Sequence, residues 1–252
     1  MRRFGFCFVV LVTVLTRAGV SQTPSDRETP RVTAKGSVGA EDVGDLTLEK
    51  VALKAGETLL VSCNDEGGDV EVTWNGTRLH RDVGTRGSGF YTTLYSLYSA
   101  AGGTGDLVAT HDSAGDLTIN AYAVTNLVAS ALDRTASAHG MDTSPSSGAT
   151  TTTTHANEFL WGAIGFATNS KGSGTWNDGF TAGTQFTDTG GIGGVDDGYK
   201  TVSTTGAYTA AKAGVDKSAW AAVIATYATT AGREVIEPTA THRSGVAHER
   251  QP

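Results

Sequence analysis

The chain has 252 residues, a mass of 26.0 kDa and a formal net charge of -7, with 33 glycines against 5 prolines. Hydrophobic residues make up 38% and charged residues 18%, so the chain can bury a core, and the glycine excess favours tight turns over a collagen-like or proline-rich stalk. Phosphate backbones and anionic lipids repel a protein with a pI near 5.3, so the composition excludes nucleic acid as an expected partner.

The N-terminus has the pattern of a secretory signal peptide. Arg2 and Arg3 precede an apolar run over 4–15, and small residues follow around Ala18. Residues 1–22 are therefore predicted to be cleaved during export, which places the mature protein outside the cell or at its surface, with no membrane insertion afterwards. An uncleaved anchor is the alternative, although a span needs roughly 20 apolar residues.

A leader and a tail flank the predicted folded part. Residues 23–44 are rich in proline, serine and charge and lack apolar periodicity, which predicts a disordered leader. A single domain is expected over 45–230, followed by a disordered tail over 231–252. Cys63 is the one cysteine left after cleavage, so no internal disulfide can form, and this lone thiol is expected to be a small buried hydrophobe.

Short strands separated by turn residues follow from residue 45 onward. In the first half, alternating apolar residues predict strands near 46–53, 58–62, 70–74, 90–99, 106–110 and 117–127. Asn75-Gly76, directly after the third of these, is the strongest short signal for a β-hairpin. The stretch 128–139 is the only one for which a helix is considered.

The stretch 158–167, which contains Trp161, is apolar on both alternating faces and predicts a central strand covered on both sides. The threonine-rich stretch 149–154 is predicted as an exposed strand, with a glycosylated or disordered linker as the alternative. Further strands are expected at 180–188, 199–203, 206–210 and 219–227, with a glycine- and aspartate-rich loop at 190–198. The recurrent spacing of strands and turns predicts an all-β, two-sheet antiparallel sandwich.

Several segments resemble a group of bacterial secreted modules. The resemblance depends on Val72-Thr-Trp-Asn-Gly76, the turn Gly102-Gly-Thr-Gly105 after an aromatic strand, the threonine run before Glu158, and the closing segment 220–227. It implies a jelly-roll sandwich of the concanavalin A-like kind over about 45–228, found in cell-surface or virion-associated proteins. Some members of this architecture bind glycans and others hydrolyse them, so the resemblance indicates a fold more specifically than a function.

Paired acids are the first candidates for catalysis. Asp69 and Glu71 stand two apart on a predicted strand, which separates their carboxylates by about 7 Å, within reach of glycoside hydrolysis. The simpler interpretation is the solvent face of an amphipathic strand, because a general acid needs an apolar pocket that raises its pKa. Glu158 has no second acid in register and is expected at a solvated strand end.

Other chemistry has weaker support. No serine-nucleophile elbow occurs, and the scattered histidines have no metal-ligand spacing, so neither a catalytic residue nor a transition-metal site is predicted. Calcium is the one cofactor considered, because the oxygen-bearing residues Asn177, Asp178, Asp196 and Asp197 crowd two loops, although plain turns use the same residues.

Glycan binding is the preferred function. Sugars stack on aromatic faces flanked by polar groups, and loops at the end of a sandwich collect such residues. The predicted ligand-binding residues are Trp176, Asn177, Asp178, Asp196, Asp197 and Tyr199. The sequence therefore predicts a secreted, non-enzymatic module for surface attachment or recognition of a polysaccharide or surface glycan, with a ligand-free spacer and a glycoside hydrolase as alternatives; it does not indicate the oligomeric state.

Overall fold

The computed structural model describes residues 29–66, 68–167, 174–186 and 193–231. This part of the chain is all-β, with fourteen strands and no helix, so it holds no helix of the length and apolarity that a membrane span requires. The predicted signal peptide at 1–22 and the predicted tail from 232 onward lie outside the described residues.

Seven strands form the larger antiparallel sheet. They are β1 (Val32–Leu53), β2 (Thr58–Asp65), β3 (Val70–Trp74), β4 (Thr77–Arg78), β5 (His80–Arg86), β6 (Tyr91–Leu97) and β7 (Gly103–Val124). The order is β4-β3-β7-β2-β6-β5, and β1 pairs with β7. Because β2 pairs with 117–124 of β7 and β3 with 107–111, these two strands follow one another along β7.

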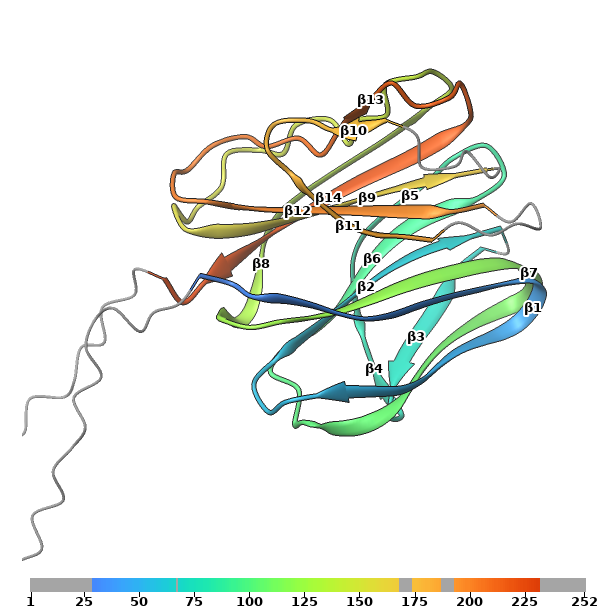
Figure 1. The fold of residues 1–252 in the computed structure, drawn as a ribbon, viewed down its shortest axis with the longest axis horizontal. Coiled ribbons are helices and arrows are strands. Elements are labelled where there is room, and N and C mark those ends of the chain that lie inside the picture. The colour runs from blue at the N-terminus through green and yellow to red at the C-terminus, as the bar shows by residue number, and fades with distance from the viewer. Residues whose placement is uncertain (1–28, 67, 168–173, 187–192, 232–252) are drawn as a thin grey trace, which may run out of the picture.

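The larger sheet is folded over on itself. Side chains of β2 alternate between two cores, since successive residues of a strand point to opposite faces. Leu59, Val61 and the fully buried Cys63 pack with β3 and with the 107–109 part of β7, whereas Leu60 packs toward the second sheet. Figure 1 accordingly shows β3 and β4 on the opposite side of β2 and β6 from the second sheet.

The second sheet has five antiparallel strands. They are β8 (Leu127–Gly140), β9 (Glu158–Phe166), β11 (Thr181–Gln185), β12 (Val195–Val202) and β14 (Trp220–Thr229), in the order β11-β12-β9-β14-β8. Every residue of the central strand β9 is buried, and Trp161 is 2% exposed, so the predicted central strand is confirmed. A two-stranded sheet of β10 (Thr175–Trp176) and β13 (Lys212–Ala213) lies above it in Figure 1.

Some predictions about elements are confirmed, and others are wrong. The all-β antiparallel class holds, and Asn75 and Gly76 close the β3–β4 hairpin with φ values of 48° and 75°. The disordered leader is wrong for residues 32–43, because β1 already begins there and pairs with 115–124 of β7. The stretch considered as a helix is strand β8, whose backbone pairs with β14.

The threonine run is not a strand. It runs beside residues 206–210 and is joined to them by hydrogen bonds. These bonds occur at every third residue of 147–153 and at every second residue of 206–210. Backbone N–H groups of Ser147, Thr150 and Thr153 donate to the carbonyls of Ala210, Tyr208 and Gly206, and the three hydroxyls accept from the N–H groups of the same partners. This pairing satisfies the backbone of two segments predicted as strands, and it places them as a cover on the outer face of the five-stranded sheet, where Ala210 packs on Leu160.

Candidate functional site

Part of the predicted binding set meets over the outer face of β12. The small sheet of β10 and β13 pairs Trp176 with Lys212. On β12, Asp196, Gly198 and Lys200 share one face because they alternate with the residues between them. Lys212 contacts Asp196, and Trp176 lies against Gly198. These two residues of the small sheet therefore face successive outward positions of β12.

Glycine at position 198 lets the indole of Trp176 lie flat on the sheet. A Cβ atom added there would lie 2.6 Å from Cδ2 of the indole, closer than side chains approach one another. The ring of Phe180 stacks on the indole with centroids 5.7 Å apart and planes at 23°. Trp176 is half-buried and Phe180 is buried, so the pair presents one partly open aromatic surface.

A two-residue turn brings these two rings together. Asp178 and Gly179 have φ values of 53° and 73°, and the N–H of Phe180 donates to the carbonyl of Asn177 at 3.2 Å, as in a type I′ turn. Asn177 and Asp178 were predicted as ligand-binding residues. They form the turn and do not line the hollow beside it, so their role is to position the aromatic pair.

Lys212 and Asp196 form a buried ion pair beside the aromatic surface. The ammonium Nζ of Lys212 lies 2.7 Å from Oδ2 of Asp196, and the two side chains are 3% and 5% exposed. The same ammonium lies 5.9 Å from the ring centroid of Trp176. Because the cost of removing two charges from water offsets most of their attraction, a buried pair of this kind is weak evidence for stability.

Asp197 points to the opposite face of β12, toward β7. Its Oδ2 accepts hydrogen bonds from Nδ2 of Asn120 at 2.7 Å and from the hydroxyl of Tyr122 at 2.9 Å. Burial raises the pKa of Asp197 to about 7, against the opposing effect of the hydrogen bonds from Asn120 and Tyr122. Asp197 therefore links the two sheets.

The aromatic pair and the ion pair open onto one hollow of about 380 Å³. We call it the β12 hollow; it is lined by Trp176, Phe180, Gln185, Asp196, Asp197 and Lys212, with small residues of β10 and β11 completing it. Its volume lies at the low end of the range of about 300–1,000 Å³ for small-molecule sites. An aromatic face beside charged and amide groups can bind a polar ring compound by stacking and hydrogen bonding.

Tyr199 does not belong to the β12 hollow. Its ring stacks on Phe159 with centroids 6.0 Å apart, in the core between the two sheets. The sequence assigned Asp196 and Asp197 to a loop and Tyr199 to its end. All three lie in β12, because this segment has backbone partners on both sides, in β9 and β11.

Among the residues that line the hollow, sequence reasoning missed Phe180, Gln185 and Lys212, which bear its remaining large or charged side chains, and four small residues. Phe180 gave a partial signal, since it follows an Asn-Asp-Gly turn directly after Trp176. Gln185 and Lys212 gave none, because their role depends on which strands pair and which segment covers them.

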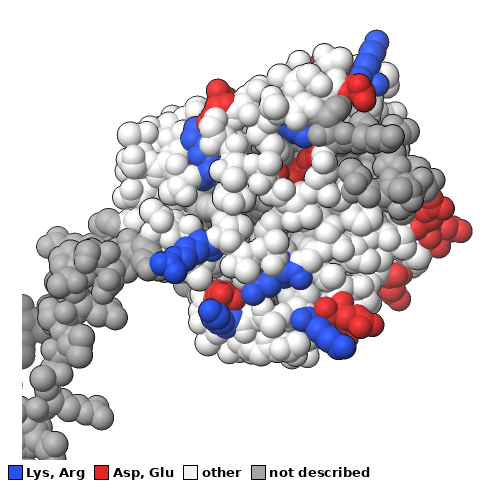
Figure 2. All heavy atoms as spheres, in the orientation of Figure 1, with Lys and Arg blue, Asp and Glu red and all other residues white. Residues whose placement is uncertain are grey.

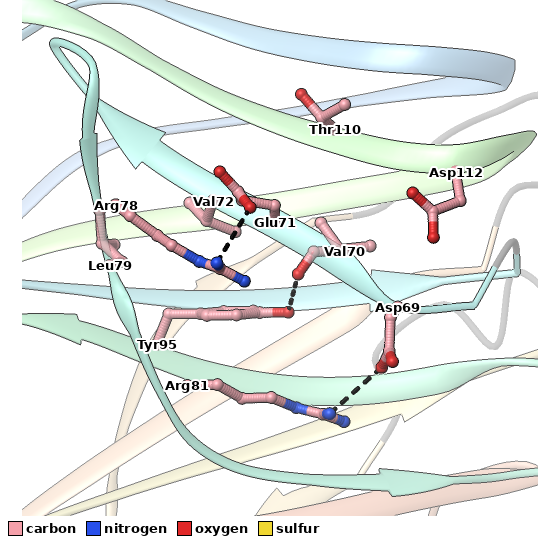
Figure 3. A pocket seen from close by; sticks show the side chains of 10 residues that line it. All are labelled: Asp69, Val70, Glu71, Val72, Arg78, Leu79, Arg81, Tyr95, Thr110 and Asp112. Carbon is pink, nitrogen blue, oxygen red and sulfur yellow. Dashed lines mark hydrogen bonds and ion pairs between the residues drawn. The ribbon is translucent and has the colours of Figure 1, made fainter.

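A second, larger groove of about 600 Å³ lies beside β3. Figure 3 shows Arg78 and Arg81 reaching across it toward Glu71 and Asp69, with N–O distances of 3.3 and 3.2 Å. The side chains of Asp69 and Glu71 are 81% and 48% exposed, so neither acid has the apolar enclosure of a general acid. Tyr95 bridges the groove from below, and its hydroxyl donates to the backbone of β3.

Glu158 was expected at a solvated strand end, and this prediction is wrong. The residue is fully buried at the start of β9. Burial is the main cause that raises its pKa to about 7, and the neighbouring acid Asp133 adds to it.

Within the described ranges, no three His, Cys, Asp or Glu side chains gather as a metal site would require. The residues considered for calcium, Asn177, Asp178, Asp196 and Asp197, are divided, since Asp196 pairs with Lys212 and Asp197 bonds to residues of β7. This arrangement gives no support to a calcium site, which was considered from the sequence but not predicted.

The fold and the hollow together define the class as an all-β antiparallel protein, compatible with a sandwich, with an aromatic and charged site on the outer face of one sheet. Comparison with known proteins goes no further, because no protein-family profile, no curated protein and no solved structure matches the chain. The concanavalin A-like, bacterial secreted family stays a prediction.

Proposed function

We propose that the protein is a secreted, non-enzymatic module that recognises glycans in the β12 hollow, at the cell surface or on a polysaccharide. One observation carries this proposal: the stacked Trp176 and Phe180 and the ion pair of Lys212 and Asp196 open onto the same hollow. Stacking fits the apolar face of a sugar ring, and charged groups bind its hydroxyls. Export through residues 1–22 and a jelly-roll arrangement of the two sheets are parts of the same proposal.

A glycan array followed by isothermal titration tests it. Trp176→Ala is expected to weaken binding about tenfold or more, because truncating a central aromatic contact costs about 2 kcal/mol or more. Tyr208→Ala is the matched control, since Tyr208 is also a half-buried aromatic residue of the cover but does not line the hollow. Equal binding by wild type and Trp176→Ala, with both proteins folded, would refute the site.

Two rival functions give different results. A spacer without a small ligand binds no sugar on the array, and this result would end the glycan proposal. One observation favours a glycoside hydrolase: Asp69 and Glu71 line the larger groove beside β3. Release of reducing ends from a β-glucan that disappears in Glu71→Gln would establish it; we expect no release.

A further inference from the structure

We infer that the β12 hollow selects uncharged sugars and rejects glycans that carry carboxylate or sulfate groups. This inference rests on the proposed function, because it specifies the class of glycan that the same site takes. It follows from the charges that line the hollow and from how each of them is already used.

The cation of the hollow is occupied. Lys212 is the one cationic residue among the described residues that line it, and its ammonium lies 2.7 Å from the carboxylate of Asp196. Both side chains are almost completely buried. An anionic ligand could use Lys212 only by displacing Asp196, and it would then leave that carboxylate buried without a counter-charge, which is costly.

No second cation lines the hollow among the described residues. The other acid, Asp197, points to the opposite face of β12, where its carboxyl group accepts hydrogen bonds from Asn120 and Tyr122. A ligand carboxylate in the hollow therefore meets an ammonium that is already neutralised, together with the carboxylate of Asp196, whose repulsion grows as water is excluded.

The surroundings do not reverse this balance. Lys200 lies near the ring of Phe180, but its ammonium donates to the carbonyl of Asp178 at 2.6 Å and it does not line the hollow. The acidic and basic side chains on the face in Figure 2 lie in small groups separated by uncharged surface, with no large basic patch on that face. The net charge of the whole chain is -7. Long-range attraction of an acidic glycan is therefore not expected.

An uncharged sugar can use every group that the hollow offers. Its carbon atoms can contact the part of the Trp176 indole that Gly198 and Phe180 leave exposed, and its hydroxyls can both donate and accept. Gln185 and Thr175 are exposed at the mouth, where the amide and the hydroxyl can each do the same. Hydroxyl donors can also reach the carboxylate of Asp196 without breaking its ion pair, because a carboxylate has several acceptor positions.

The test compares oligosaccharides that differ only in charge. Oligogalactosides and oligogalacturonides, and the equivalent glucose and glucuronate series, have the same ring stereochemistry within each pair. Titration of the wild-type protein is expected to give at least about tenfold tighter binding for the neutral member of a binding pair. Asp196→Asn removes the negative charge that lies 2.7 Å from the Lys212 ammonium, so the preference is expected to move toward the uronide by about tenfold or more.

Asp45→Asn is the matched control. It removes one negative charge by the same change of side chain at an exposed position of β1 that does not line the hollow. The preference should stay within about twofold of wild type.

The outcomes separate this inference from the proposed function. Uronides that bind as tightly as their neutral partners, with binding lost in Trp176→Ala, would overturn the inference and leave glycan recognition intact. If no member of either series and no other glycan binds, both fail. Should Asp196→Asn fail to fold, the wild-type comparison of the matched pairs still decides.

Discussion

Replacing Gly198 by alanine tests whether the indole of Trp176 lies against β12. The added Cβ would lie 2.6, 2.7 and 2.9 Å from three atoms of the indole, whereas ordinary contact begins at 3.4 Å. The ring therefore has to move outward by about 1 Å, and overpacking of this kind costs about 1–3 kcal/mol of the free energy of unfolding. Gly44→Ala is the control, because a Cβ atom at position 44 meets nothing within 4 Å.

Urea unfolding measures the change in stability, and iodide quenching of fluorescence reports on the indole itself. The chain has four tryptophans, and Trp74, Trp161 and Trp220 are 4%, 2% and 6% exposed, so Trp176 should dominate quenching by a dissolved ion. Gly198→Ala is expected to increase quenching and to weaken glycan binding, since the displaced indole no longer forms the same face. Stability within about 0.5 kcal/mol of Gly44→Ala, with unchanged quenching, would refute the packing on which the site depends.

Three further variants test other parts of the structure. Glu158→Gln should remove a pH dependence of stability, because the pKa of Glu158 is raised from 4.5 to about 7 in the folded state. The wild type therefore loses stability as the pH rises through this range. In thermal unfolding, the variant should be more stable than the wild type by about 1–3 kcal/mol at pH 8 and similar to it at pH 4. A wild type that is stabilised between pH 5 and 8 relative to the variant would contradict this. Lys212→Met should lower the free energy of unfolding in urea by about 3–5 kcal/mol, because it removes the cation that pairs with the buried Asp196. Adding Asp196→Leu should restore most of this free energy. No recovery in the double variant would show that the pair itself stabilises the fold. Tyr95→Phe should cost about 1 kcal/mol, because the Tyr95 hydroxyl donates to the carbonyl of Val70 at 2.8 Å in a buried position, and an unaltered urea midpoint would argue against this bridge.

The parts of the fold that could be predicted are those with a local signal. Asn75-Gly76 and the apolar run around Trp161 specify a hairpin and a covered strand through turn chemistry and alternation alone, and the structure confirms both. The first half of β1 gave no such signal because it lies at a sheet edge. Its residues need only a backbone partner, and the long strand β7 provides one.

The candidate site was predictable only in part for the same reason. Trp176, Asp196 and Asp197 line the hollow as residue types suggested, but Asp196 and Asp197 look like loop residues when read along the chain. They belong to a strand because each carboxyl group finds a partner that is distant in sequence, Lys212 in one case and Asn120 with Tyr122 in the other. Propensity scales do not contain such partners.

The double role of β12 limits how this protein can diversify. The outward residues of β12 contact Trp176 and Lys212 of the small sheet, and its inward residues contact the opposite sheet. A random substitution in β12 therefore disturbs the contacts with one of these two layers. Gln185 and Thr175, which are exposed at the rim, carry neither constraint. Evolutionary or laboratory changes of ligand preference should therefore accumulate at the rim, while the strand beneath it stays fixed.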